Sequence, residues 1–190
     1  INCLALYFHD VKGVKVAKVF YFIPESKVTE QEDRVDYRRW ISEGWIFVTP
    51  GNVIDIDFQV DKIYDIVKRY NCRVISFDPA KAYHGTVQAL QKKGLSYILD
   101  EFAQNIRNMS EPTRTLQKFV EGAEIDLLGD PVLRWMFRNA VAISDSNDNI
   151  KLDKKKSQNK IDGLIALINA IGGSMSLVKP EPYLNGEIKV

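Results

Sequence analysis

The pattern of hydrophobic and polar positions predicts two antiparallel strands followed by alternating helices and strands. Residues 4–8 and 14–22 are apolar, β-branched and aromatic, and residues 9–13 between them have the length and the glycine of a hairpin loop. Apolar residues at helical spacing over 60–67 precede a short apolar run over 73–77, which indicates a helix followed by a buried strand. The pattern therefore predicts a mixed α/β fold.

The second half of the chain carries further helix and strand signals. Residues 95–99 follow a helical stretch and a glycine, so we expect a strand there. Ser110 and Asp130 are each followed closely by a proline, and both are predicted to begin a helix as N-caps. A turn-forming cluster over 145–148 predicts a small hairpin.

An apolar helix over 161–171 is expected to end at the glycine pair Gly172 and Gly173, because helices often end at glycine. The residues beyond it contain prolines and no clear period. We therefore expect one domain over 1–173 and a C-terminal tail over 174–190.

Composition narrows the class of protein without naming a partner. Of 190 residues, 45% are hydrophobic and 27% charged, which excludes disordered, collagen-like and fully membrane-embedded chains. The net charge is +1, so any affinity for a polyanion must come from where the charges lie. No apolar run approaches the roughly 18 residues of a membrane span, and the two cysteines have neither metal-ligand spacing nor a disulfide pattern. These features predict a soluble intracellular protein.

Asp78 is the sharpest local feature, because it ends the apolar run over 74–77 and is followed at once by Pro79. In open α/β sheets, ligands bind beyond the carboxyl ends of strands, so a carboxylate there is well placed for a metal or a substrate. The competing interpretation is that Asp78 only caps the turn into the next helix.

Asp162 lies in the first turn of a helix whose neighbours are almost all apolar. A helix N-terminus stabilises a carboxylate, so a structural role is one interpretation. Gly163 beside it costs helix stability and lets another backbone or a substrate come close, which favours a functional role.

Five lysines fall within residues 151–160, just before Asp162, in a chain otherwise balanced in charge. Clustered lysines release counterions when they meet phosphates, which gives affinity for nucleic acid without regard to sequence. Such a run is more often a solvated loop, and its nearness to a candidate metal carboxylate is what favours DNA binding. The phosphate-loop, dinucleotide and serine-hydrolase motifs are absent from the sequence.

Seven segments occur in the order found in one known family: DRV (33–35) with Tyr37, TPGNVID (49–55), FDP (77–79), MSEPT (109–113), DPVLRWM (130–136), NIK (149–151) and KIDG (160–163). As a set, they resemble the C-terminal nuclease domain of the large terminase subunit of tailed phages, the DNA-packaging motor protein. The resemblance spans about positions 1–171.

The resemblance implies a ribonuclease H-like α/β fold over residues 1–173, with a mixed sheet that opens with an antiparallel meander and is flanked by helices. In that family, Mg²⁺ or Mn²⁺ ions held by acidic residues activate water to cut concatemeric phage DNA. By motif, Asp78 corresponds to the second active-site acid and Asp162 to the last. The first acid of the family lies upstream of the stretch that begins at Ile1, so the two-metal site is expected only in the complete domain. We expect two acids alone to bind metal weakly and to cut slowly or not at all.

The resulting hypothesis is a divalent-metal-dependent endodeoxyribonuclease domain. Asp78 and Asp162 would be the catalytic, metal-holding acids, and the candidates for contact with the DNA backbone are Lys154, Lys155, Lys156, Lys160, Lys81 and Arg138. Asp55 is a further candidate for the site. The resemblance also implies double-stranded DNA, the terminase ATPase domain, the small terminase subunit and the portal as partners, with no membrane, in the cytoplasm of the bacterial host.

Two other hypotheses remain open at this point. The chain could be a docking module that contacts DNA and the portal or neighbouring motor subunits without catalysis. It could also be a resolvase-like nuclease on the same fold.

Overall fold

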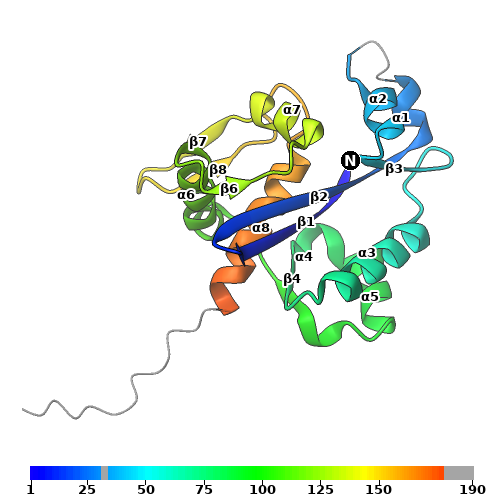
Figure 1. Cartoon of the computed structure of the whole chain (residues 1–190), viewed down its shortest axis with the longest axis horizontal. Helices are drawn as coiled ribbons and strands as arrows, with labels where there is room; N and C mark the ends of the chain where they lie inside the picture. Colours follow the sequence, from blue (N-terminus) through cyan, green and yellow to red (C-terminus); the bar gives the residue numbers. More distant parts are fainter. Residues whose placement is uncertain (31–33, 178–190) are drawn as a thin grey trace, which may run out of the picture.

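The computed structural model describes residues 1–30 and 34–177, without the side chains of 81–84 (Figure 1). The chain opens with β1 (Asn2–Val11) and β2 (Val14–Pro24), which pair antiparallel from Asn2 opposite Phe22 to Phe8 opposite Val16. The hairpin turn places Gly13 at φ +84°, a conformation that glycine adopts without strain. The predicted antiparallel hairpin is confirmed.

Strand β2 also pairs with two further strands, one near each of its ends. Helices α1 (Glu25–Glu30) and α2 (Tyr37–Ser42) lead to β3 (Ile46–Thr49), which pairs parallel with the end of β2. The short strand β6 (Ile125–Asp126) pairs parallel with the start of β2. These four strands form a mixed sheet.

A second, two-stranded sheet lies apart from the first. Helix α3 (Ile56–Tyr70) leads to β4 (Ile75–Phe77), which pairs parallel with β5 (Leu99–Glu101). Between these strands the chain forms α4 (Pro79–Ala82), the π-helical turn η1 (Tyr83–Val87), α5 (Gln88–Lys92) and the 3₁₀ turn η2 (Ser96–Ile98).

The strand predicted over 95–99 is therefore wrong over most of its length. Leu95 and Ile98 are both buried against α3 and α5, and the N–H of Ile98 donates to the carbonyl of Leu95 at 3.1 Å. A 3₁₀ turn places residues three apart on one face, so two apolar residues with that spacing are both buried. Only Leu99 and the two residues after it form the strand.

Helix α6 (Ile106–Glu121) begins earlier than predicted. Its N-cap is Asn105, whose side chain accepts the N–H of Asn108 at 2.9 Å. Ser110 and Pro112 lie inside the helix and are buried, so Ser110 as a helix start is wrong. The hydroxyl of Ser110 instead accepts the N–H of Ile150 at 3.1 Å.

The prediction for Asp130 is confirmed, because its side chain caps α7 (Pro131–Asn139) and accepts the N–H of Leu133 at 2.9 Å. The hairpin around residues 145–148 is confirmed as well. Strands β7 (Ala142–Ser144) and β8 (Ile150–Leu152) pair antiparallel on either side of that turn.

Helix α8 (Asp162–Leu177) runs straight through the glycine pair at which the sequence predicted its end. The predicted domain boundary at residue 173 therefore falls inside α8, and the part of the tail from 178 to 190 lies outside the described residues. A Cβ on Gly172 would lie 2.5 Å from the ring of Phe102, and one on Gly173 would lie 1.9 Å from the hydroxyl oxygen of Ser76. The glycines serve close packing in mid-helix rather than a helix end.

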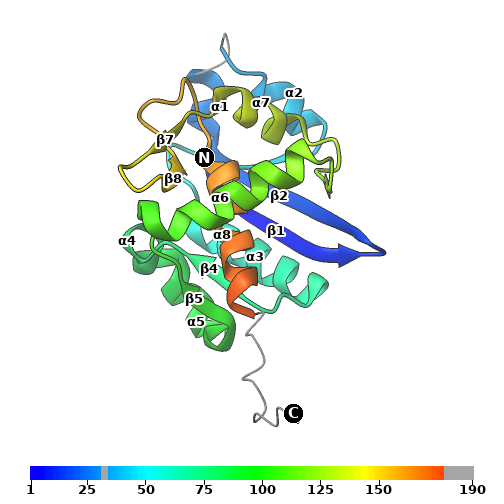
Figure 2. The same cartoon turned by 90° about the vertical axis from the view of Figure 1, so that its left-hand side faces the viewer.

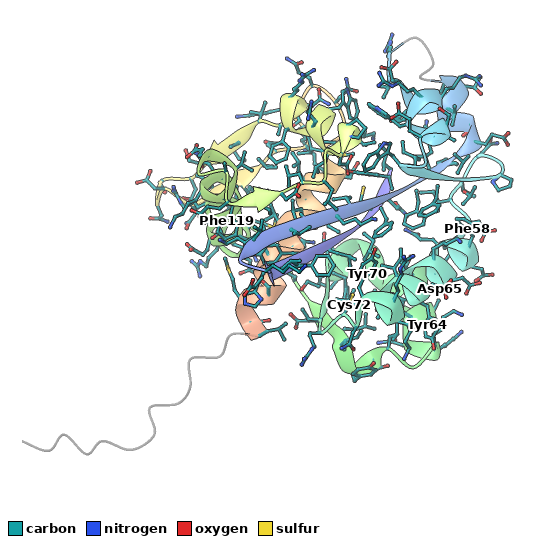
Figure 3. All side chains as sticks on the ribbon, viewed as in Figure 1. Phe58, Tyr64, Asp65, Tyr70, Cys72 and Phe119 are labelled. Carbon is teal, nitrogen blue, oxygen red and sulfur yellow. The ribbon has the colours of Figure 1, made fainter. Side chains whose placement is uncertain are left out.

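The apolar helix α8 organises the molecule. It packs against β1, β4, α6 and α7, and α6 lies across it (Figure 2). The larger hydrophobic core joins α8 to the four-stranded sheet, α6 and α7, while a smaller core joins α3, α5 and β5. Figure 3 shows Phe119 of α6 on one side of the hairpin, and Tyr64, Tyr70 and Cys72 on the other.

Among the described residues, no helix is long and apolar enough to cross a membrane.

Candidate functional site

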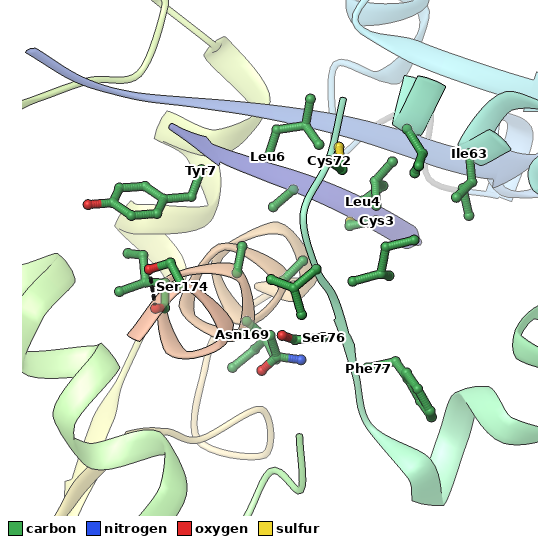
Figure 4. A pocket seen from close by; sticks show the side chains of 18 of the residues that line it. Cys3, Leu4, Leu6, Tyr7, Ile63, Cys72, Ser76, Phe77, Asn169 and Ser174 are labelled. Carbon is green, nitrogen blue, oxygen red and sulfur yellow. Dashed lines mark hydrogen bonds between the residues drawn. The ribbon is translucent and has the colours of Figure 1, made fainter. Parts of the chain in front are cut away.

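A cleft with a volume of about 1380 Å³ separates the two sheets. Strand β1 lines it on one side and β4 on the other, with residues of α3 and α8 completing the wall (Figure 4). Both candidate carboxylates, Asp78 and Asp162, line this cleft. The fold thus brings two acids that are far apart in the sequence to the wall of one cavity.

Asp78 follows the last residue of β4 and precedes α4, at the carboxyl end of a parallel strand. Its Oδ1 accepts the N–H of Ala80 at 3.2 Å, and the residue is half-buried. The capping interpretation of Asp78 is therefore confirmed, and its functional role stays a prediction for a residue that lines the cleft. The capping bond does not use Oδ2.

Asp162 is the first residue of α8, where the exposed N–H groups of the helix favour a negative charge. The ammonium group of Lys154 lies 2.5 Å from its Oδ1. The side chain of Asp162 is 20% exposed and that of Lys154 is 40% exposed, and both residues line the cleft. A cation already contacts the carboxylate that the sequence marked as a metal ligand.

Gly163 fixes the start of α8 against two neighbouring elements. Its N–H contacts the sulfur of Met136 in α7 at 3.1 Å. A Cβ at this position would lie 2.9 Å from that sulfur and 2.9 Å from Cε1 of Tyr21 in β2. The absence of a side chain therefore lets α8 approach β2 and α7 closely enough to place Asp162 at the cleft.

Tyr21 and Asp130 form a buried hydrogen bond beneath this contact, with the hydroxyl of Tyr21 donating to Oδ2 of Asp130 at 2.7 Å. Burial raises the pKa of Asp130, and the hydrogen bonds from Leu133, Tyr21 and Val132 oppose that shift. Sequence reasoning missed the role of Tyr21. The available signal was a tyrosine in an apolar strand, because a buried tyrosine hydroxyl usually finds a partner.

The raised pKa of Asp130 predicts how stability depends on pH. In the folded protein, Asp130 keeps its proton to higher pH than in the unfolded chain, where the pKa of its carboxyl group lies near the ordinary 3.8. The stabilisation from this group is therefore present at acid pH and is lost as pH rises through the folded pKa. In urea unfolding from about pH 3.5 to 7, wild type should lose stability relative to Asp130→Asn as pH rises. A difference between the two proteins that stays constant with pH would contradict this assignment.

The negative charge of Asp162 contributes to the raised pKa values of two further side chains. Burial and, to a lesser degree, Asp162 raise the pKa of the Cys3 thiol. The same two causes raise the pKa of Tyr37 to about 12. Both groups are therefore neutral at pH 7, and Cys3 is a thiol rather than a thiolate that could bind metal.

The sequence matches the family described as "Terminase large subunit, endonuclease domain" over residues 16–176. The chain belongs to this family. It is 30% identical over 159 residues to the large terminase subunit of Enterobacteria phage HK97, covering 82% of this chain and 31% of that protein. It is 29% identical over 202 residues to protein YmfN of Escherichia coli (strain K12), covering 100% of this chain and 43% of the relative. The chain thus spans less than half the length of these relatives.

The crystal structure of the HK97 bacteriophage large terminase superposes on this chain with a TM-score of 0.81 at 28% identity. The match covers 90% of this chain and 36% of the HK97 chain. The predicted fold class, a ribonuclease H-like mixed α/β fold, is confirmed for this terminase nuclease chain. The predicted antiparallel opening meander is present as the β1–β2 hairpin, and β3 pairs parallel with β2.

Four of the other sequence-predicted DNA contacts of the terminase nuclease chain lie on its surface. Lys155, Lys156 and Lys160 are exposed in the loop before α8, and Arg138 is exposed in the last turn of α7. The side chain of Lys81 lies outside the described residues. These contacts remain predictions.

Asp55, the further candidate, caps α3 by accepting the N–H of Phe58 at 3.0 Å. This bond explains the residue without a catalytic role. Asp55 also does not line the cleft, so the structure gives it no place beside Asp78 and Asp162.

Asp78 and Asp162 are of the ligand type that a divalent ion takes. Mg²⁺ takes oxygen ligands and is commonly bound through one or two carboxylates with water completing the shell. Within residues 1–30 and 34–177, no group of three or more His, Cys, Asp and Glu side chains is arranged to hold a metal. The two-ion site expected for the complete domain stays a prediction.

Lys154 should compete with a metal ion for Asp162. A partly exposed ion pair contributes up to about 0.2–1 kcal/mol, so Lys154→Gln should tighten Mn²⁺ binding by roughly 1.4- to 5-fold, measured by titration with electron paramagnetic resonance. Lys155→Gln is the matched control, because the backbone N–H of Lys155 is held by Asp153 rather than by Asp162. Weaker Mn²⁺ binding in Lys154→Gln would show that the lysine orders the site instead of competing for it.

Proposed function

We propose that this chain is a divalent-metal-dependent DNA endonuclease domain that cuts concatemeric DNA during genome packaging. Membership of the terminase endonuclease family supports a nuclease role in packaging. The single observation that carries the proposal further is that Asp78 and Asp162 line one cleft.

In this proposal, Asp78 and Asp162 hold Mg²⁺ or Mn²⁺. A bound ion supplies an activated water and stabilises the charge that develops on the scissile phosphate. The chain itself provides the geometry. Asp78 is fixed by its bond to Ala80, and Asp162 is fixed by the packing of Gly163 on Tyr21 and Met136.

The DNA backbone is proposed to lie along the loop before α8 that carries Lys154, Lys155, Lys156 and Lys160, here named the lysine loop. Lys154 already contacts Asp162, so a phosphate bound by this lysine would lie beside the candidate metal carboxylate. Lys155, Lys156 and Lys160 extend the positive charge along the same loop, and Lys81 and Arg138 are further candidates. Such contacts give affinity that falls steeply with salt and does not depend on base sequence.

The proposed partners are double-stranded DNA, the terminase ATPase domain, the small terminase subunit and the portal. The proposed location is the cytoplasm of the bacterial host. Membership of the terminase family favours packaging over a resolvase-like reaction.

A second candidate function is a docking module that binds DNA and motor subunits without catalysis. One observation favours it, namely that the described residues contain no group of three or more potential metal ligands. Two carboxylates hold a pair of ions 3.5–4 Å apart poorly.

Incubation of supercoiled plasmid with the full-length gene product and Mn²⁺ separates the two functions. The endonuclease proposal expects nicked and linear DNA that disappears with EDTA. If the chain is a docking module, a mobility-shift assay should show salt-dependent DNA binding, and no cleavage should occur at any Mn²⁺ concentration. Cleavage that persists in EDTA would contradict the metal requirement.

A further inference from the structure

A buried side-chain hydrogen bond joins the two elements that hold the start of α8. The hydroxyl of Tyr21 in β2 donates to Oδ2 of Asp130, the residue that caps α7, at 2.7 Å. Tyr21 is 0% exposed and Asp130 is 5% exposed. The two residues are 109 positions apart in the chain, so their bond fixes α7 to β2 rather than closing a local turn.

Asp130 does more than cap its helix. Asp55 and Asn105 also cap helices, but they are exposed, and each side chain accepts one backbone N–H three positions further along. Asp130 accepts the N–H of Leu133 with Oδ1 in the same way, at 2.9 Å, and accepts the Tyr21 hydroxyl with Oδ2. A cap needs neither burial nor a distant partner. Because a buried carboxylate costs free energy unless hydrogen bonds replace its water, the second bond indicates a role beyond capping.

The start of α8 lies between the two elements that this bond joins. On the α7 side, the N–H of Gly163 contacts the sulfur of Met136 at 3.1 Å. On the β2 side, a Cβ on Gly163 would lie 2.9 Å from Cε1 of Tyr21 and 3.5 Å from its hydroxyl oxygen. The hydroxyl that donates to Asp130 therefore also borders Gly163. A change in the spacing of β2 and α7 would move Gly163, because the contacts on both sides are already close.

The carboxylate of Asp162 lies near the same part of the sheet. Asp162 directly precedes Gly163 and lines the cleft. Cys3 lies opposite Tyr21 in the β1–β2 ladder and also lines the cleft. Burial raises the pKa of the Cys3 thiol, and the negative charge of Asp162 raises it further. Neither Tyr21 nor Asp130 lines the cleft, so this pair can affect a bound ion only through the position of Asp162.

We propose that Tyr21 and Asp130 are positioning residues for the metal site. Their hydrogen bond sets the spacing of β2 and α7, and this spacing fixes Gly163 and the direction in which Asp162 presents its carboxylate to the cleft. A fully satisfied buried polar network rigidifies a core in one arrangement, and a displacement of about 1 Å at an active site can cost about 100-fold in rate. The inference rests on the proposed function in one respect, namely that Asp162 holds the ion.

Tyr21→Phe in the full-length gene product tests the hydrogen bond, because phenylalanine keeps the ring beside Gly163 and removes only the hydroxyl. Half-maximal activation of plasmid cleavage should need at least about fivefold more Mn²⁺, and kcat should fall at least about tenfold. The KM for DNA should change by less than about twofold, since the bond does not contact DNA. A residue that only stabilised the fold would lower the fraction of active protein without changing the Mn²⁺ requirement.

Hydrogen exchange in the absence of metal separates this inference from the proposed function. The N–H of Ile165 donates to the carbonyl of Ile161 at 3.1 Å, across the start of α8. In Tyr21→Phe, amides over 163–166 should exchange at least about tenfold faster than in wild type, because the start of α8 opens more readily. Amides over 63–67 in α3 should not change. If wild type neither binds Mn²⁺ nor cuts DNA, the proposed function fails, and this exchange alone then decides the inference.

Substitutions at Asp130 provide a second, independent test. Asp130→Ser keeps a capping oxygen, but this single oxygen on a shorter side chain cannot serve both Leu133 and Tyr21. It should reproduce both effects of Tyr21→Phe, and the double variant should be no worse than either single variant, because both remove the same bond. Asp130→Asn can still cap α7 and donate its amide to the Tyr21 hydroxyl, so its Mn²⁺ requirement should stay within about twofold of wild type.

Asn105→Ala is the matched control, because it removes an exposed cap with no contact to Gly163. Its exchange over 163–166 and its Mn²⁺ requirement should equal those of wild type. The inference is overturned if Tyr21→Phe exchanges like wild type over 163–166 or needs no more Mn²⁺ than wild type. It is also overturned if the losses of Tyr21→Phe and Asp130→Ser add in the double variant, because the two residues would then act separately.

Discussion

Asp162→Asn in the full-length gene product should lower Mn²⁺-dependent plasmid cleavage by at least about 100-fold. A metal ion supplies several kcal/mol of transition-state stabilisation, and each 1.36 kcal/mol corresponds to a tenfold change in rate. Asparagine keeps the size of the side chain and an oxygen that can accept from Lys154, so the fold of α8 should be unchanged. Asp78→Asn should show a loss of similar size while keeping the bond to the N–H of Ala80.

The matched control is Asp126→Asn. Asp126 also accepts a backbone N–H in a turn, that of Leu128 at 2.7 Å, but it does not line the cleft. Its cleavage rate should equal that of wild type within about twofold, and all three variants should melt within a few degrees of wild type. Undiminished cleavage in either Asp78→Asn or Asp162→Asn would remove that residue from the site.

Gly172→Ala should destabilise the protein by about 1–2 kcal/mol. The added Cβ would lie 2.5 Å from Cζ of Phe102 and 3.1 Å from Cγ of Pro112, and overpacking of this kind costs about 1–3 kcal/mol or more. Alanine has a higher helix propensity than glycine by up to about 1 kcal/mol, which offsets only part of the clash. Urea unfolding of residues 1–190 measures the difference.

Ser176→Ala in the last turn of the same helix is the control. Ser176 is exposed, so its replacement should change stability by no more than about 0.5 kcal/mol. Combining Gly172→Ala with Phe102→Leu should recover part of the loss, because the shorter side chain relieves the contact and residues in contact are not additive. A Gly172→Ala protein as stable as wild type would show that α8 can shift away from Phe102 at little cost.

The glycine pair illustrates why part of the fold could not be predicted from the sequence. Glycine after an apolar helical stretch is equally compatible with a helix end and with close packing in mid-helix. Only the positions of Phe102 and Ser76, from distant segments, decide between the two. The β1–β2 hairpin and the cap at Asp130 were predictable because their signals are local.

Part of the candidate site could likewise be predicted from local sequence patterns, and part of it could not. Asp78 could be found because a carboxylate at the end of a buried strand is a local pattern, and Asp162 because a helix start is one. The bond between Tyr21 and Asp130 joins residues 109 positions apart, and no periodicity encodes it. The contact of Lys154 with Asp162 depends on the path of the lysine loop back to α8. The sequence showed only that the lysines lie shortly before Asp162 in the chain.

The central claim is that Asp78 and Asp162 together hold a divalent ion in the cleft between the sheets. Anomalous scattering from crystals of the full-length gene product grown with Mn²⁺ tests it directly. The account predicts a Mn²⁺ peak within about 2.0–2.4 Å of carboxylate oxygens of both residues, with the ammonium group of Lys154 displaced from Asp162. A peak bound by only one of the two carboxylates, or a cleft without Mn²⁺ at saturating concentration, would contradict it.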